Sequence, residues 1–225
     1  MDGYILVDKP KGVSSFGVVA KVRGCIRACT GQKVKVGHIG TLDPMATGLL
    51  VLVVGKYTKK VPDLIGHNKT YDVELTLGQI SSTGDIEGDI TDINNTQPAK
   101  EQLLSVLNKF VGPQMQTPPA FSAIKVNGQR AYDLARKGKE VKIEPRQITI
   151  HSINLTDYNY PKVHFVCNVS SGTYIRSLAQ DIGTALGTGA YMSNLRRTAI
   201  DIFDIKNSIQ LNNINSQNVT QLLSK

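Results

Sequence analysis

The chain has 225 residues, of which 40% are hydrophobic and 20% charged, enough for the core of one large domain or two small ones. Its longest apolar run, residues 49–54, is far shorter than the roughly 20 residues of a membrane helix, and its N-terminus lacks a secretory pattern. The sequence therefore predicts a cytoplasmic protein with no membrane partner. A net charge of +8 favours nucleic acid as a partner, although charge alone leaves a basic protein with no such role equally open.

Hydrophobic periodicity predicts the elements of the first half of the chain. Val18, Val22 and Ile26 recur at helical spacing after the N-cap candidates Ser14 and Ser15. A continuous apolar run predicts a strand buried on both faces, and alternation of apolar with polar residues predicts a half-buried strand. The elements expected here are strands at 4–7, 49–54 and 70–77 and helices at 16–28 and 98–110, the last with a proline in its first turn.

The second half of the chain predicts more strands than helices. Several of the strands follow one another without an intervening helix, which favours an α+β fold with a mixed, largely antiparallel central sheet flanked by helices. The polar, Asn-rich stretch from 204 to 218 predicts no more than one short helix. The remaining elements expected are helices at 132–136 and 172–186 and strands at 147–155, 163–169 and 191–199.

Three patterns resemble cofactor or metal sites and are set aside. Residues 51–58 lack the first glycine of a phosphate-binding loop, and Tyr57 stands where that loop needs Ser or Thr. Residues 85–89 are followed by Ile90 where a calcium loop needs glycine, so an acidic surface loop is expected. Cys25 and Cys29 have no second ligand pair. The sequence thus predicts neither a cofactor nor a metal.

The most informative segment is 36–48, V-G-H-I-G-T-L-D-P-M-A-T-G, which places Asp43 just before a buried strand. Its glycines permit close approach of a ligand, and Pro44 stiffens the residue before it. A carboxylate fixed in such a loop is a plausible catalytic group. Taken without other information, an Asp-Pro pair in a turn is more often structural.

This segment resembles the catalytic motif G-H-x-G-x-L-D-P-x-A-T-G of TruB-family pseudouridine synthases. Further blocks of that family follow in the same order over about 200 residues. They are D-K-P-K-G-V-S-S at 8–15, K-T-Y at 69–71, L-G-Q at 77–79 with Thr83, Asp85 and Gly88, P-P-A-F-S-A-I-K at 118–125, S-S-G-T-Y-I-R at 170–176 and L-R-R at 195–197. The resemblance implies the pseudouridine synthase catalytic fold and an enzyme that needs no cofactor.

The resemblance also implies roles for single residues. Asp43 would be the catalytic carboxylate, Tyr71 would stack on the target uracil and accept the C5 proton, and Arg176 would pair with Asp43. His38 would sit beside the flipped nucleotide, where stacking replaces what the base loses on leaving its helix. Tyr174, Lys9 and Leu195 would line or brace the pocket. Without the resemblance, each of these has an ordinary structural reading: core packing for Tyr71, a surface ion pair for Arg176 and a turn cap for His38.

The resemblance implies RNA contacts outside the pocket as well. Residues 118–142 would form a basic, thumb-like insertion that grips the RNA stem-loop. The expected RNA-binding cations are Lys59, Lys125, Arg130, Arg136 and Lys137. The whole of 1–225 is expected to be one catalytic domain, with 198–225 as a short polar tail in place of a complete PUA domain.

The implied substrate is uridine 55 in the T-loop of tRNA, modified by a monomer without guide RNA. Two alternatives remain. One is a catalytically weak chaperone that binds and folds tRNA with the same pocket, which the presence of Asp43, Tyr71 and Arg176 disfavours. The other is a subunit of an RNA-guided particle, which the missing C-terminal domain disfavours.

Overall fold

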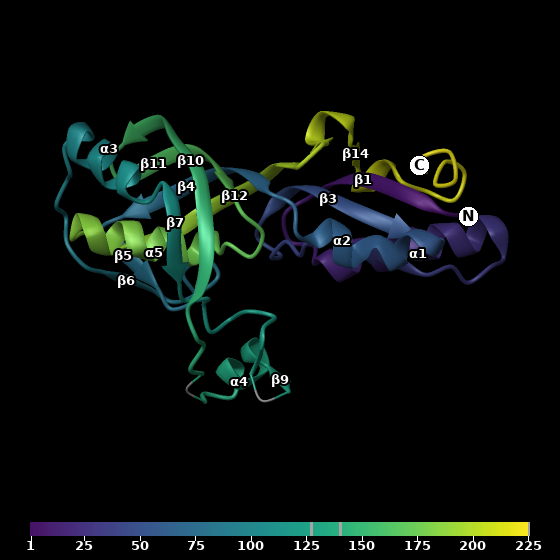
Figure 1. Ribbon diagram of the computed structural model, residues 1–225, viewed down its shortest axis with the longest axis horizontal. Helices are drawn as coiled ribbons and strands as arrows, with labels where there is room; N and C mark the ends of the chain where they lie inside the picture. The colour runs from purple at the N-terminus through teal and green to yellow at the C-terminus, as the bar shows by residue number, and fades with distance from the viewer. Residues whose placement is uncertain (127, 140, 225) are drawn as a thin grey trace. The chain divides into compact units, whose positions relative to one another are not determined.

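The computed structural model describes residues 1–126, 128–139 and 141–224, and the chain forms two compact units (Figure 1). The first unit consists of Met1–Tyr71 and Leu195–Lys225, and the second of Asp72–Asn194. The chain passes from the first unit to the second within strand β4 and returns within strand β12. None of the described helices is long and apolar enough to cross a membrane.

The first unit is built on a central pair of antiparallel strands. β1 and β3 pair along their whole length, with Ile5 opposite Leu52, and the end of β12 runs parallel to β3, with Arg196 opposite Thr47. The elements are β1 (Gly3–Lys9), α1 (Ser15–Thr30), β2 (Val36–His38), β3 (Thr47–Val54), η1 (Gly55–Lys60), α2 (Val61–Ile65), β13 (Phe203–Asp204), η2 (Ile205–Asn207), β14 (Ile209–Gln210) and η3 (Leu211–Asn213), with the ends of β4 (Lys69–Leu77) and β12 (Ala190–Ile200).

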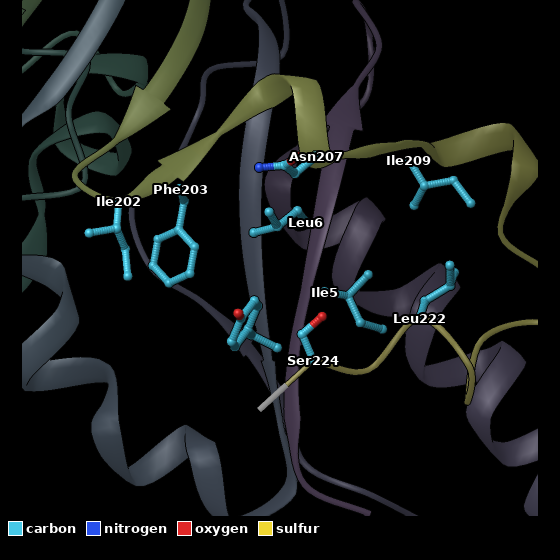
Figure 2. A pocket seen from close by; sticks show the side chains of 9 residues that line it. Ile5, Leu6, Ile202, Phe203, Asn207, Ile209, Leu222 and Ser224 are labelled. Atoms are coloured by element: carbon cyan, nitrogen blue, oxygen red, sulfur yellow. The ribbon is translucent and has the colours of Figure 1, made fainter.

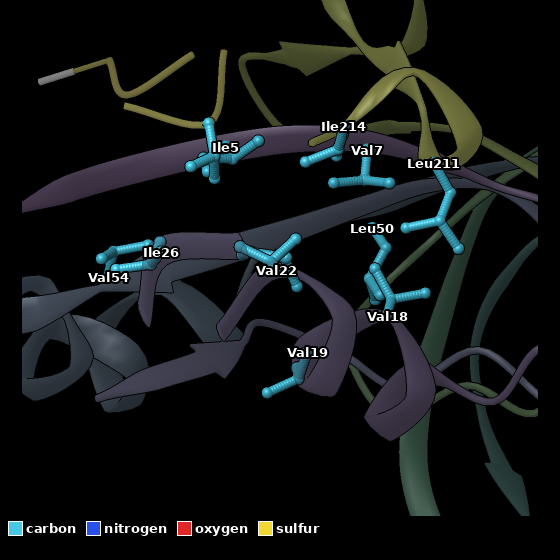
Figure 3. Close-up of a cluster of buried hydrophobic side chains, with 12 residues drawn as sticks. Ile5, Val7, Val18, Val19, Val22, Ile26, Leu50, Val54, Leu211 and Ile214 are labelled. Atoms are coloured by element: carbon cyan, nitrogen blue, oxygen red, sulfur yellow. The ribbon is translucent and has the colours of Figure 1, made fainter. Parts of the chain in front are cut away.

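Helix α1 covers one face of this pair. Ser14 is its N-cap and accepts a hydrogen bond from the amide of Gly17, as the sequence predicted. Val18, Val22 and Ile26 pack against β1 and β3 (Figure 3). Seven of the eight residues of β3 are buried, which confirms the expected doubly covered strand.

The C-terminal tail is more than a polar extension. Leu211, Ile214 and Val219 insert into the same core as α1, and β14 pairs in parallel with β1 through Val7 and Ile209. The Asn-rich composition hid this because only every third to fifth residue is apolar. The short helix expected near the end is replaced by 3-10 turns and a bridge from Ser224 to Tyr4. Lys225 lies outside the described residues.

The second unit holds an antiparallel sheet. Its strand order is β12, β4, β11, β10 and β7, and β10 and β11 form a long hairpin. The remaining elements are β5 (Gln79–Ser81), β6 (Ile90–Asp92), α3 (Lys100–Lys109), β7 (Gly112–Gln116), β8 (Lys125–Val126), β9 (Gln129–Arg130), α4 (Ala131–Arg136), β10 (Arg146–Asn159), β11 (Lys162–Val169) and α5 (Ile175–Leu186).

The α+β class and the largely antiparallel sheet are confirmed, and most predicted elements are present. Two helices begin later than expected: α3 at Lys100, after Pro98, and α5 at Ile175, where Tyr174 rather than Gly172 precedes the first turn. Strand β7 lies in a segment for which the sequence predicted no element, because its proline and two glutamines hide the strand pattern. It pairs with β10, where a partner strand supplies what local sequence does not.

Candidate active site

Asp43 lies in the loop of residues 39–46 between β2 and β3, called the Asp43 loop below. The strands on either side are paired with each other, His38 opposite Leu52, so both ends of the loop are held by the sheet. Asp43 is half-buried, and its carbonyl accepts a hydrogen bond from the amide of Ala46 at 3.1 Å, which closes a turn. The acid therefore sits on a short, constrained loop at a strand entrance.

Lys9 supports this loop from within the protein. Its side chain is 0% exposed, and its ammonium donates to the carbonyls of Pro10 (3.0 Å), Val13 (2.6 Å) and Pro44 (3.2 Å). An ammonium has three protons, and these three carbonyls account for them. Lys9, which was expected to line or brace the pocket, thus holds the carbonyl of Pro44, the residue next to Asp43, with its ammonium buried. A role of Lys9 toward RNA stays a prediction.

Arg197 clamps the other side of the loop. Its side chain is 0% exposed, with Nε donating to the Leu49 carbonyl at 2.8 Å, Nη1 to Thr41 at 3.3 Å and Nη2 to Gly40 at 2.9 Å. No carboxylate pairs with Arg197 in the described part of the chain. A buried guanidinium balanced only by carbonyl dipoles is costly, so its place beside the Asp43 loop suggests a functional reason. In the sequence, Arg197 stood out only as part of the L-R-R motif at 195–197, without a role of its own.

Gly48 makes this arrangement possible. Its φ is +100°, and a Cβ there would lie 2.3 Å from the backbone oxygen of Arg197. Thus β3 and β12 approach so closely at this point that only glycine fits. The glycine of the motif is required by packing of the strand that carries Arg197.

The first turn of α1 also holds the loop. The hydroxyl of Ser15, a buried residue, accepts from the amide of Leu42 at 2.8 Å and donates to the carbonyl of Leu42 at 2.9 Å. The amide of Gly12 donates to the carbonyl of Pro44 at 2.8 Å. The residues on both sides of Asp43 are therefore hydrogen-bonded to the segment before α1 and to its start.

Two basic side chains of the first unit are electrostatically coupled to Arg197. Burial, and then the charge of Arg197, lower the pKa of His38, so its imidazole is neutral at pH 7. The same causes lower the pKa of Lys69 to about 8; its ammonium donates to the carbonyls of Ile65 and His67. A neutral imidazole suits contact with an uncharged base. Among the described residues, His38 Nδ1 is buried without a hydrogen-bond partner.

Tyr71 and Leu195 lie at the ends of the first unit, where β4 and β12 leave and re-enter it. Tyr71 is 6% exposed, on the same face of β4 as Lys69 and Val73. Leu195 is buried, and its carbonyl accepts from the Thr47 hydroxyl at 3.5 Å. Their roles toward a uracil stay predictions.

In the second unit, Arg176 is held by the buried carboxylate of Asp85, a residue that the sequence predicted to lie in an acidic surface loop. Its Nε lies 3.5 Å from Asp85 Oδ2, and its terminal nitrogens donate to the carbonyls of Thr83 and Phe121 at 3.3 and 2.9 Å. Asp85 is 3% exposed and also accepts from the Thr83 hydroxyl at 2.6 Å. The expected acidic surface loop is therefore wrong for Asp85, which orients Arg176, and right for Glu87 and Asp89. The pairing of Arg176 with Asp43 stays a prediction.

Tyr174 is held at the start of α5 by two residues that sequence reasoning missed. The side-chain amide of Gln116 accepts from the Tyr174 amide at 2.8 Å and donates to its carbonyl at 3.0 Å. The guanidinium carbon of Arg146 lies 4.9 Å from the centre of the Tyr174 ring, and Arg146 also donates to the carbonyl of Gly172. Both partners lie in strands, β7 and β10, so their proximity depends on strand pairing.

The cations predicted to bind RNA are all exposed. Arg130 and Arg136 flank the ring of Tyr132, with guanidinium carbons 5.8 and 5.7 Å from its centre, and Lys125 and Lys137 lie beside them in β8 and after α4. Lys59 is exposed in η1 of the first unit. Residues 127 and 140 of the predicted insertion lie outside the described residues. The exposure of these cations is consistent with RNA contact, which stays a prediction.

Two of the cavities that the described residues form lie in the first unit. The larger, about 300 Å³, lies between β1 and the C-terminal tail, lined by Ile5, Phe203 and Leu222 among others (Figure 2), and contains none of the predicted site residues. The smaller, about 210 Å³, is lined by Lys9, Thr47 and Arg196 and adjoins the strand that follows the Asp43 loop. Its lining includes Lys9, which also holds the carbonyl of Pro44 in the Asp43 loop. Within the described ranges, no three His, Cys, Asp or Glu residues are grouped to hold a metal.

The chain is similar to known proteins in both structure and sequence. Solved structures of a Cbf5–Nop10–Gar1 complex and an archaeal box H/ACA Nop10–Cbf5 complex match with TM-scores of 0.72 and 0.68 at 30% and 26% identity. Both matches cover 93% of this chain. They cover 52% and 51% of the respective Cbf5-complex chains, so this chain spans about half the length of each matched chain.

Sequence relatives match more of their own length. The chain is 43% identical over 213 residues to tRNA pseudouridine synthase B of Aquifex aeolicus, covering 94% of this chain and 72% of that protein. It is 44% identical over 224 residues to the protein of the same name from Clostridium tetani, covering 99% and 76%. The model of the TruB family pseudouridylate synthase N-terminal domain matches residues 27–175, and that of the tRNA pseudouridylate synthase B C-terminal domain matches residues 176–223. The chain belongs to the TruB family of pseudouridylate synthases.

Proposed function

We propose that this chain isomerises uridine to pseudouridine in tRNA, with Asp43 as its catalytic carboxylate. The observation that carries the proposal is the bracing of the Asp43 loop. Lys9, Ser15 and Arg197, all buried, hold the backbone on both sides of the acid. A protein that only binds RNA has no need to immobilise one half-buried carboxylate in this way.

The chemistry requires a positioned acid more than any added group. The bond between N1 of uracil and C1′ of the ribose breaks, the base turns, and a bond from C5 to C1′ forms while C5 loses its proton. Asp43 would begin this sequence by attacking the sugar or the base, or by removing a sugar proton. Tyr71 would stack on the extruded uracil and accept the C5 proton. Arg176, oriented by Asp85, would pair with Asp43 and keep the carboxylate aimed.

The proposed target is uridine 55 of the T-loop, bound by a monomer in the cytoplasm without guide RNA. The relatives named tRNA pseudouridine synthase B support the tRNA substrate. The matched Cbf5 chains are in complex with Nop10, and one of them also with Gar1, and this chain corresponds to about half of each Cbf5 chain. The exposed arginines around Tyr132 would grip the stem of the T-arm.

The first test is Asp43→Asn, an isosteric change that removes the negative charge. We expect release of tritium from tRNA labelled at C5 of uridine to fall at least about 10³-fold, because the reacting group is lost. RNA binding should be nearly unchanged. Asp63→Asn is the matched control, since Asp63 is an exposed acid in α2 of the same unit. Normal turnover by Asp43→Asn would overturn the assignment of Asp43.

The same experiment separates the enzyme from the alternative of a tRNA chaperone. A chaperone would promote tRNA folding equally well with either substitution and would release no tritium. An enzyme of the proposed kind releases tritium in proportion to the pseudouridine that mass spectrometry maps to the T-loop.

A further inference from the structure

The positive charge of this protein is divided unevenly between its two units. The first unit contains fifteen Lys and Arg against six Asp and no Glu, whereas the second contains eleven Lys and Arg against twelve Asp and Glu. The first unit therefore carries a surplus of nine positive charges, and the second a deficit of one. The basic insertion belongs to the second unit, where acids elsewhere in the unit offset its positive charge, so the net charge of the chain resides in the first unit.

Within the first unit the charge gathers around α1. Residues 9–42 contain seven Lys and Arg and no acid, and residues 205–225, which pack into the same core as α1, contain no acid either. The acids of this unit lie elsewhere: Asp8 pairs with Arg196 at 2.8 Å, and Asp201 lies 2.9 Å from His67. Among the described residues, the cations along α1 thus have no acidic side chain close in sequence or in the tail that packs beside them.

The outer face of α1 is shaped for an extended anionic chain. Phe16, Ala20, Arg23 and Arg27 recur at helical spacing on the face opposite Val18, Val22 and Ile26, and all four are exposed. Lys33 and Lys35 continue the exposed cations beyond the helix. From Phe16 to Arg27 the stripe rises about 16 Å along the helix axis, enough to face several phosphates.

Phe16 marks the end of this stripe nearest Asp43. It is 66% exposed, and the guanidinium carbon of Arg23 lies 5.8 Å from the centre of its ring. The preceding residue, Ser15, holds the backbone of Leu42 and so lies beside the Asp43 loop. A ring with an adjacent guanidinium is a usual platform for an unpaired base or a sugar.

We infer that this stripe, made of Phe16, Arg23, Arg27, Lys33 and Lys35, binds the phosphate backbone of the substrate RNA next to the reactive nucleotide. The inference rests on the proposed function and adds a contact surface that is independent of the basic insertion. An anionic membrane fits less well, because Phe16 is the one large apolar side chain exposed on the described helix. Small residues at Ala20, Gly24 and Ala28 allow a backbone to approach closely.

The test compares two pairs of neutralising substitutions. Arg23→Gln with Arg27→Gln removes two charges from α1, and Lys100→Gln with Lys109→Gln removes two exposed charges from α3 of the second unit. Binding of an unmodified tRNA transcript is measured between about 50 and 200 mM salt. We expect the α1 pair to weaken binding about tenfold at low salt and to lower the slope of log affinity against log salt by about 2. The α3 pair should leave both unchanged.

Equal salt slopes for the α1 pair and the unaltered protein would overturn the inference, as would loss of binding to phosphatidylserine vesicles without loss of binding to RNA. Tritium release by the unaltered protein is recorded in parallel. If the unaltered protein releases tritium but the salt slope of the α1 pair is unchanged, the stripe is rejected as an RNA-binding surface and the proposed function stands. If the unaltered protein releases no tritium, the proposed function is rejected, whatever the salt slope.

Discussion

The Asp43 loop and the basic insertion are both exposed in part and both rich in turn residues, yet they are held in opposite ways. The Asp43 loop is fixed by buried cations whose donors end on its carbonyls, and Gly48 beside it admits no side chain. The insertion has short strands, one short helix and cations that face solvent around Tyr132. Rigid placement suits a reacting group, whereas adaptable contact suits the binding of an RNA stem. Three experiments test how firmly the Asp43 loop and its surroundings are held.

Replacing Arg197 should give the largest effect. Arg197→Met leaves the carbonyls of Gly40, Thr41 and Leu49 without their donor, and each buried acceptor left unsatisfied costs about 1–3 kcal/mol. We expect the free energy of unfolding in urea to fall by about 4 kcal/mol. The turnover number should fall with little change in KM, because the loop that carries Asp43 loses its position. Arg197→Lys, which keeps the charge, should restore part of the turnover.

Arg196→Met is the control for Arg197. Arg196 is the adjacent residue, is partly exposed and pairs with Asp8 at 2.8 Å, so its loss should cost less than about 1 kcal/mol. Equal losses of stability in the two variants would contradict the assignment of Arg197 as the clamp of the loop. Loss of stability in Arg197→Met without any change in turnover would make its role purely structural.

A methyl group added to one glycine in each region sharpens the comparison. Gly48→Ala places Cβ against the backbone oxygen of Arg197, at φ +100°, and should cost about 3 kcal/mol or more in thermal or urea unfolding. Gly138→Ala in the insertion has φ +68° and open space around Cβ, so it should cost about 1 kcal/mol. Similar costs at both positions would mean that the close approach at Gly48 can relax.

The smallest effect should appear as a dependence of stability on pH. Lys69 has a pKa of about 8 in the folded chain against its ordinary 10.5, because burial and then the charge of Arg197 disfavour its ammonium. Between these two values the unfolded chain binds the additional proton, so the free energy of unfolding rises with pH across that window, by on the order of 2 kcal/mol. Below about 8 both states are protonated and Lys69 adds no slope.

The contribution of Lys69 is obtained by difference, because tyrosines titrate in the same range. The unfolding free energy of the unaltered protein minus that of Lys69→Met should rise from pH 8 to 10.5, while the same difference for Lys100→Met, an exposed lysine in α3, should stay flat. A flat difference for Lys69 would show that its ammonium is not disfavoured by burial beside Arg197.

Much of the fold follows from local pattern. The apolar stripe of α1, its Ser14 cap, the continuous apolar run of β3 and the alternation along β4 each predict their element. Strand β7 and the packing of the tail could not be predicted in this way. They depend on pairing with β10 and β1, and their own residues have weak preferences.

The candidate site likewise has one part that local sequence motifs predict and another part that only tertiary contacts establish. The run of motifs from residue 8 to 197 identified the TruB family, because a reacting group and the glycines around it tolerate few alternatives. The same motifs predict Asp43 as the catalytic carboxylate, which stays a prediction. Asp85, Gln116, Arg146 and Arg197 acquire their roles only in three dimensions, where each meets a partner at least 28 residues and up to 157 residues away in the chain.

The sequence by itself thus determined the family and the proposed reacting group. Tertiary structure decided which cations are buried inside the protein and which remain exposed to bind a partner. The sequence does not distinguish buried cations from exposed ones of the same residue type. The structure buries Lys9, Lys69 and Arg197 against carbonyls, whereas Lys59, Lys125 and Arg23 face solvent. The physical reason is desolvation: a charge stays buried only where folding gathers enough oxygen atoms around it, and those atoms come from distant parts of the chain.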